Sequence, residues 1–170
     1  QIMKIKSAIF STIIATMLVA SSNIVFAADP GVVGVWGLVS LGAEDVQTGT
    51  MHQRIWGEHP VGLLIYTAAG HMSAVLTAEG RKPMTGVGEK HSEESAQLFA
   101  TMTGYAGTYN IKGDTVTHHV EVAGDPSWIG KDQVRFAKLE NGMLTISTPP
   151  MFNPADGSSY KITAVWKQLE

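Results

Sequence analysis

Apolar and polar residues alternate along most of the chain after residue 32, and short glycine-containing turns divide the alternating segments. Alternation with a period of two is typical of β-strands that have one buried face. The turns Ala69-Gly70, Lys112-Gly113 and Asn141-Gly142 each lie between two such segments and predict three antiparallel hairpins. The paired segments are 62–67 with 71–76, 105–111 with 115–122, and 133–139 with 143–147. Further strands are predicted at 33–41, 50–56 and 160–169.

One helix interrupts this pattern. Ser92 is predicted to cap its start, and Glu93 and Glu94 follow as early acidic residues. Apolar residues then recur at helical spacing as far as Gly104, which is expected to end the helix; they are Ala96, Leu98, Phe99 and Met102. About nine strands with a single short helix indicate an all-β fold.

The predicted architecture is an antiparallel up-and-down β-barrel of about 8–10 strands. Closure is favoured because it removes the exposed edge strands that an open sheet would present. A two-sheet sandwich is the structural alternative. A barrel of this size can hold one small ligand inside.

The N-terminal segment is expected to be removed before the domain folds. Lys4 and Lys6 precede an apolar stretch that ends in Val25-Phe26-Ala27, and small residues at both key positions favour cleavage after Ala27. Residues 1–27 are therefore predicted to be a signal peptide, and residues 28–170 a single mature domain. Gln1 and Ile2 precede the expected initiator Met3 and are interpreted as an added extension.

An uncleaved membrane anchor is the alternative, because the apolar stretch approaches the ~20 residues that span a bilayer. Several polar residues interrupt that stretch, which makes it a poor permanent anchor: Ser11, Thr12, Thr16, Ser21, Ser22 and Asn23. We expect an exported protein, periplasmic or secreted, with no stable membrane anchor after cleavage.

Composition excludes several function classes. The chain has no cysteine, which rules out disulfides and thiolate chemistry. Its net charge is −3, and without Lys4 and Lys6 ten basic and fifteen acidic residues remain, a net charge of −5. No basic cluster indicates a nucleic-acid partner. No phosphate loop, dinucleotide fingerprint or Gly-x-Ser-x-Gly motif is present, so no cofactor is expected.

The order of several motifs resembles one known family. Gly34-Val35-Trp36 is similar to the Gly-x-Trp signature of lipocalins. Four further segments resemble the bacterial lipocalin-like domain family in sequence and order: Pro60 to Thr67 with Gly70 to Ser73, Gly107 to Tyr109 with Gly113 to Glu121, Asp132 to Phe136, and Leu144 to Pro150. The resemblance spans Val32 to Trp166 and implies a lipocalin-like β-barrel. It implies little about chemistry, because fold does not determine function.

Strand alternation also predicts which residues face the barrel interior. With a two-residue turn at Lys112-Gly113, Tyr109 is expected to pair with Val116, Gly107 with His118, and Tyr105 with Val120. The inward face would then comprise Tyr105, Gly107, Tyr109, Val116, His118, Val120 and Val122. His119 would point outward, and a register slip of one residue would exchange the two histidines. Since adjacent histidines on opposite faces cannot share one ion, no metal site is expected.

The other two hairpins and the last strand extend this set. Leu139 is expected to pair with Leu144, and Ala137 with Ile146, which places Arg135 on the inward face. In the first hairpin the orientation stays open, because Ile65, Met72 and Ala74 form one half-apolar face while Leu64, Tyr66, His71 and Ser73 form another. The last strand is expected to point inward with Tyr160, Ile162, Ala164 and Trp166. Trp128, in a loop, is a candidate to cover the barrel mouth.

The predicted ligand-binding residues are Tyr66, Tyr105, Tyr109, His118, Trp128, Arg135 and Trp166. An inward arginine needs an acid, a carbonyl or an anionic ligand. The structural alternatives are a core histidine with satisfied hydrogen bonds at His118 and a hydrogen-bond hub at Arg135.

Three function hypotheses follow. The first is an exported barrel that binds a small, mostly hydrophobic molecule. The second is a small barrel enzyme of the isomerase, cyclase or hydratase type, in which His118 acts as general acid and base while Tyr105, Tyr109 or Arg135 stabilises an oxyanion. The third is an interaction module with an exposed apolar patch. The sequence leaves the ligand and the oligomeric state open.

Overall fold

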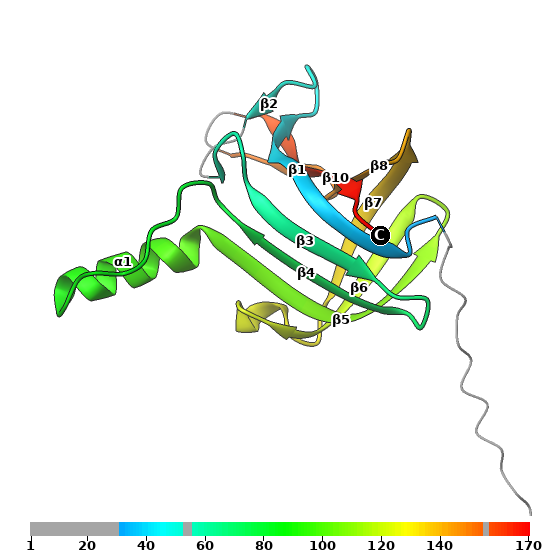
Figure 1. Cartoon of the computed structure of the whole chain (residues 1–170). Helices are drawn as coiled ribbons and strands as arrows, with labels where there is room; N and C mark the ends of the chain where they lie inside the picture. The colour runs from blue at the N-terminus through cyan, green and yellow to red at the C-terminus, as the bar shows by residue number, and fades with distance from the viewer. Residues whose placement is uncertain (1–30, 53–55, 155–156) are drawn as a thin grey trace, which may run out of the picture.

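The computed structural model describes residues 31–52, 56–154 and 157–170, and it folds into a closed antiparallel β-barrel (Figure 1). The elements are β1 (Gly34–Asp45), β2 (Met51–His52), β3 (Val61–Tyr66), β4 (His71–Thr77), α1 (Glu89–Ala100), β5 (Met102–Lys112), β6 (Thr115–Ala123), η2 (Pro126–Trp128), β7 (Asp132–Glu140), β8 (Met143–Ser147), β9 (Met151–Phe152) and β10 (Ser159–Gln168). Eight strands close the barrel in the order β1-β3-β4-β5-β6-β7-β8-β10, and β10 pairs back with β1. The predicted fold class is confirmed.

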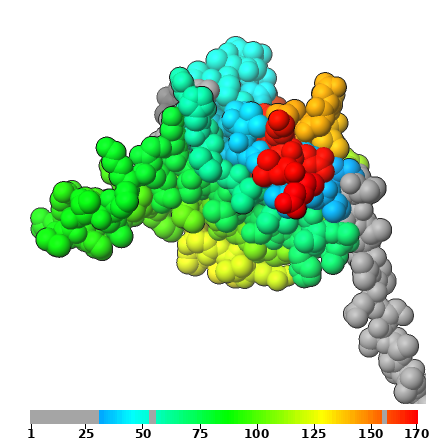
Figure 2. All heavy atoms as spheres, viewed as in Figure 1, coloured from blue at the N-terminus to red at the C-terminus, as the bar shows by residue number. Residues whose placement is uncertain are grey.

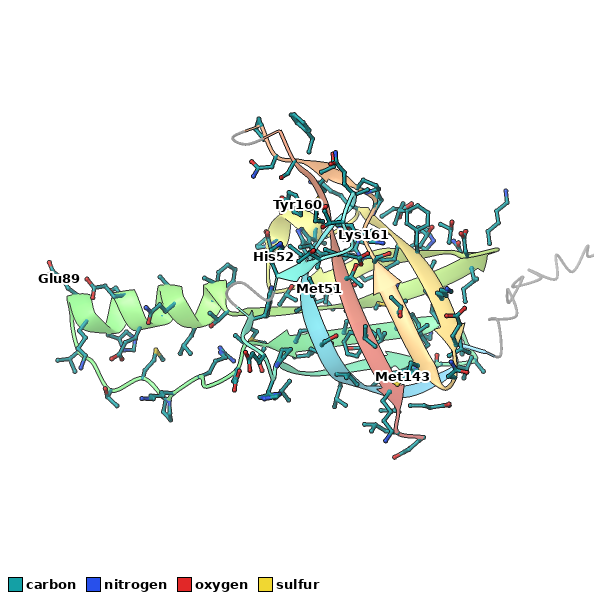
Figure 3. The ribbon with its side chains drawn as sticks, turned by 90° about the horizontal axis from the view of Figure 1, so that it is seen from above. Met51, His52, Glu89, Met143, Tyr160 and Lys161 are labelled. Atoms are coloured by element: carbon teal, nitrogen blue, oxygen red, sulfur yellow. The ribbon has the colours of Figure 1, made fainter. Side chains whose placement is uncertain are left out.

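The two shortest strands lie at one end of the barrel. β2 pairs with β1, and β9 pairs with β10. Figure 3 shows Met51, His52, Tyr160 and Lys161 together at this end and Met143 at the other. Of the strand predicted at 50–56, only β2 is described as a strand, residues 53–55 lie outside the described part, and β9 was not predicted. The predicted signal peptide also lies outside the described residues and stays a prediction.

The helix differs from its prediction at both ends. α1 begins at Glu89, because Gly88 turns the backbone with φ 60°, and it ends at Ala100. Ser92 is inside the helix, where its hydroxyl contacts the Gly88 carbonyl at 3.4 Å. None of the helix residues is buried, and Phe99 is 64% exposed. The apolar residues at helical spacing therefore do not form a face that packs against the core.

The helix stands away from the barrel as an arm (Figures 1 and 2). Its outer end carries Glu89 (Figure 3), and its inner end leads directly into β5. Among the described residues no helix is long and apolar enough to cross a membrane.

The β5–β6 hairpin corrects the expected register by two residues. Lys112 pairs with Thr115, so that Tyr109 lies opposite His118 and Gly107 opposite Val120. A shift by two residues preserves the side-chain faces, and His118 accordingly remains inward, as predicted. A bulge at Glu121 of β6, opposite the step from Ala106 to Gly107, then reverses the faces of β6 beyond Val120, and Val122 is 59% exposed instead of inward.

The other hairpins resolve the remaining orientations. Leu139 pairs with Leu144 and Ala137 with Ile146, as predicted, across the left-handed turn residues Asn141 (φ 51°) and Gly142 (φ 75°). In the first hairpin, Tyr66 pairs with Met72 and Leu64 with Ala74. All four of these side chains are buried. The inward face therefore combines residues from both of the faces that the sequence had kept apart.

Side chains fill one end of the barrel and leave the other end hollow. Trp36, Val116 and Leu144 have no exposed surface and close the filled end. The Trp36 indole donates to the Val32 carbonyl at 2.9 Å, which ties the start of the described chain across this end. The space above this packed layer, toward β2 and β9, is the candidate site.

Candidate functional site

A cavity of about 600 Å³ occupies the barrel interior, within the size range of small-molecule sites. Most of its lining is apolar and comes from strands all around the barrel. The apolar lining comprises Leu41, Trp56, Leu64, Ala74, Leu76, Trp128, Ile146, Pro149, Met151, Ile162, Ala164 and Trp166. The polar lining comprises Thr103, Tyr105, His118, Gln133, Arg135 and Thr148. An apolar body with a few polar contacts is the ligand shape that this surface complements.

His118 is the most buried polar side chain of the lining, at 1% exposure. Both ring nitrogens are occupied: Nε2 lies 2.6 Å from the Tyr66 hydroxyl and Nδ1 lies 2.9 Å from the Tyr105 hydroxyl. Burial, together with the smaller effects of the Arg135 and His119 charges, lowers the pKa of His118 to about 3. The imidazole is therefore neutral at physiological pH.

The three tyrosines near His118 occupy different positions. Tyr105 lines the cavity, whereas Tyr66 and Tyr109 lie behind His118 and do not border the cavity. The rings of Tyr66 and Tyr109 pack with their centroids 4.6 Å apart, and the Tyr109 hydroxyl donates to the Thr67 carbonyl at 2.9 Å. Burial raises the pKa of Tyr66 and of Tyr105, so both hydroxyls keep their protons.

Arg135 is the one charged side chain among the described residues that line the cavity, since His118 is neutral. Its guanidinium donates to the Val134 carbonyl at 2.8 Å and to the Gln133 side-chain oxygen at 3.2 Å. Its positive charge lowers the pKa of Tyr105, against the larger opposite effect of burial. No carboxylate in the described part of the chain forms an ion pair with it.

Two tryptophans complete the lining. Trp128 lies in η2, which Asp125 stabilises by accepting the Ser127 backbone N–H at 2.9 Å. The Trp128 ring packs edge-on against the Tyr105 ring, with 5.4 Å between the ring centroids. Trp166 borders the cavity from β10, and its buried indole Nε1 finds no acceptor in the part of the chain that is described.

Comparison with known families identifies the barrel. The model of the lipocalin-like domain matches residues 33–169, which is most of the chain. The chain belongs to the lipocalin-like domain family. A search of curated proteins found no match. The resemblance noted from the motifs is thus confirmed over nearly the whole range they cover.

The lipocalin-like barrel brings five of the seven predicted ligand-binding residues to one cavity: Tyr105, His118, Trp128, Arg135 and Trp166. Tyr66 and Tyr109 support this group from behind. On the last strand, Ile162 and Ala164 also line the cavity, in the orientation predicted for that strand.

The predicted ligand-binding residues omitted some of the lining. Strand alternation places Gln133 on the same face of β7 as Arg135, but Gln133 was not included among those residues, and it lines the cavity. Trp56 lies outside any strand, and no local pattern indicated that it would reach the cavity. Among the described residues of this lipocalin-like barrel, no group of three His, Asp or Glu side chains could hold a metal ion.

Proposed function

We propose that this lipocalin-like protein binds a small, mostly apolar molecule inside its barrel. The observation that carries the proposal is the cavity of about 600 Å³ with an apolar lining and one group of polar side chains. Toward the other end of the barrel, Trp36, Val116 and Leu144 form a packed layer with no exposed surface, beside which lies only a much smaller described cavity of about 130 Å³. A hollow beside a packed layer is what a binding protein needs, because the packed layer stabilises the fold while the hollow receives the ligand.

The proposal includes export. It is supported by the sequence of residues 1–27, with two lysines before an apolar stretch and small residues before the expected cleavage site. The protein would then meet its ligand in the periplasm or outside the cell. Intact-mass measurement of protein taken from the periplasmic fraction tests this, because cleavage after Ala27 predicts a chain that begins at Ala28.

A catalytic use of the same cavity has less support. As a general acid and base, His118 would need a ring nitrogen that can exchange a proton with a substrate. Both nitrogens are engaged by tyrosine hydroxyls, and the pKa of about 3 lies far below neutral pH. These contacts suit a residue that orients its neighbours better than one that carries out proton transfer.

Binding can be tested with N-phenyl-1-naphthylamine, an uncharged apolar dye that fluoresces when it leaves water. Ala164 lines the cavity and is 6% exposed, so Ala164→Phe would fill part of the cavity. We expect the affinity for the dye to fall about tenfold or more, since the substituted ring takes space that the ligand needs. Val165→Phe is the matched control, because Val165 points to the outer face of the same strand.

The proposal fails if the wild-type protein does not bind the dye, or if a folded Ala164→Phe protein binds it as tightly as wild type does. Circular dichroism shows whether both variants are folded. Native mass spectrometry with lipid extraction of protein from its own periplasm then identifies the class of molecule that is bound.

A further inference from the structure

The polar side chains of the cavity gather on β5, β6 and β7, and they include one positive charge. Arg135 borders a mostly apolar cavity without a carboxylate partner among the described residues. Its contacts to Val134 and Gln133 are to neutral oxygens, which leave the charge uncompensated. In surroundings of low polarity an uncompensated guanidinium attracts an anion strongly.

The hydrogen bonds around His118 indicate where the neighbouring protons lie. Tyr66 is 1% exposed, and His118 Nε2 is the described acceptor within reach of its hydroxyl, at 2.6 Å. Since a buried hydroxyl proton needs an acceptor, Tyr66 donates to Nε2. A neutral imidazole that accepts at Nε2 carries its proton on Nδ1, and this N–H donates to the Tyr105 oxygen at 2.9 Å.

The Tyr105 hydroxyl can consequently act as a hydrogen-bond donor. Its oxygen accepts from His118 Nδ1, so its O–H donates to a partner other than His118. Tyr105 and Arg135 both line the cavity. The cavity is therefore bordered by two donors, one neutral and one charged, and no described carboxylate pairs with the charged one.

We propose that Arg135 and Tyr105 form a binding site for the carboxylate of a ligand whose remaining body is apolar. The proposal rests on the proposed function and names the ligand class: a monocarboxylic acid. One positive group balances one negative charge, whereas a dianion such as a phosphate monoester would keep a charge unpaired. A planar carboxylate also matches the planar donor pattern of a guanidinium. Tyr66 and His118 are positioning residues, which act through the orientation of the Tyr105 hydroxyl.

The test compares decanoate with 1-decanol, two ligands of equal chain length that differ in the head group, as competitors of the uncharged dye at pH 7.5. Wild-type protein is expected to bind decanoate at least about tenfold more tightly than decanol. Arg135→Gln should weaken decanoate binding about 10- to 100-fold, the loss typical of removing a charged hydrogen-bond partner, and change dye and decanol affinities much less, so that the preference for decanoate is lost. Lys138→Gln on the same strand removes an equal charge from an exposed side chain and should change none of the affinities.

Variants of the tyrosines test the arrangement of the protons. Tyr105→Phe removes the proposed neutral donor and should lower decanoate affinity about threefold to tenfold without a matching loss for decanol. Tyr66→Phe frees His118 to protonate Nε2, so the ratio of decanoate to decanol affinity should fall. A purely structural role of Tyr66 would instead lower both affinities equally and leave the ratio unchanged.

The outcomes separate this inference from the proposed function. If wild type binds dye and decanol but shows no preference for decanoate, or if Arg135→Gln keeps the preference, the carboxylate site is refuted while apolar binding stands. If the wild-type protein binds neither the dye nor either competitor, the proposed function is refuted as well.

Discussion

Lowering the pH from 7.5 to 5.0 should reduce the free energy of unfolding through His118. In the folded protein the pKa of His118 is about 3, because burial disfavours the charged imidazole and the Arg135 and His119 charges act in the same direction. In the unfolded chain the side chain returns to its ordinary pKa of about 6.5. Between these values the unfolded chain binds a proton that the folded chain does not, and acid therefore favours unfolding.

The size of the effect follows from the two pKa values. At pH 7.5 the imidazole is neutral in both states and contributes almost nothing. At pH 5.0 it is still neutral in the folded barrel but mostly protonated when unfolded, which costs about 2 kcal/mol of stability by linkage. The exposed carboxylates of Asp45, Glu94 and Asp125 also have lowered pKa values, but their titration falls below this pH range.

Urea denaturation followed by tryptophan fluorescence at both pH values measures this difference. His118→Gln should lose about 2 kcal/mol less than wild type between pH 7.5 and 5.0, whatever its stability at pH 7.5. His119→Gln retains the buried imidazole and should keep the wild-type loss. Equal losses in wild type and His118→Gln would refute the reasoning. Should His118→Gln fail to fold, NMR of the wild-type ring decides, since a ring protonated at pH 5.0 would refute it too.

Two pairs of substitutions test the packing of the barrel, each measured by urea denaturation. Trp36→Phe removes the donor to a buried carbonyl and should cost roughly 2–4 kcal/mol. Trp166→Phe removes a buried donor that has no acceptor among the described residues and should stay within about 1 kcal/mol of wild type. Equal losses would contradict the hydrogen-bond argument. Gly107→Ala places a Cβ against the His119 carbonyl oxygen at the bulge and should cost roughly 1–3 kcal/mol, while Gly104→Ala makes only ordinary contacts and should be near neutral. A stable Gly107→Ala protein would show that the bulge can move.

Much of the barrel was predictable because strand patterns are local. Alternation predicted all eight barrel strands, with boundaries within four residues, and placed His118 inward even though its predicted pairing partner was wrong. A register error of two residues preserves the face of every side chain, so this error was harmless. Where the backbone departs from regular pairing, as at the bulge at Glu121, the same reasoning put Val122 on the wrong face.

The helix was predicted, but its bounds were wrong at both ends. Helical spacing of apolar residues predicts a buried stripe only when another element packs against it. α1 is an arm outside the barrel, and Phe99 remains exposed. The helix starts after Gly88, whose backbone has a positive φ of 60°. The capping pattern at Ser92 gave no indication of this earlier start.

The sequence by itself determined the strands, the inward faces and the candidate residues, because these follow from the period of the side chains along each strand. Only the tertiary structure decided how those residues meet. Tyr66 and His118 are 52 positions apart on strands that do not pair, and their contact depends on the curvature of the closed barrel. The tertiary structure also decided that no described carboxylate forms an ion pair with Arg135. From the sequence alone, any of the fifteen acidic residues was a possible partner.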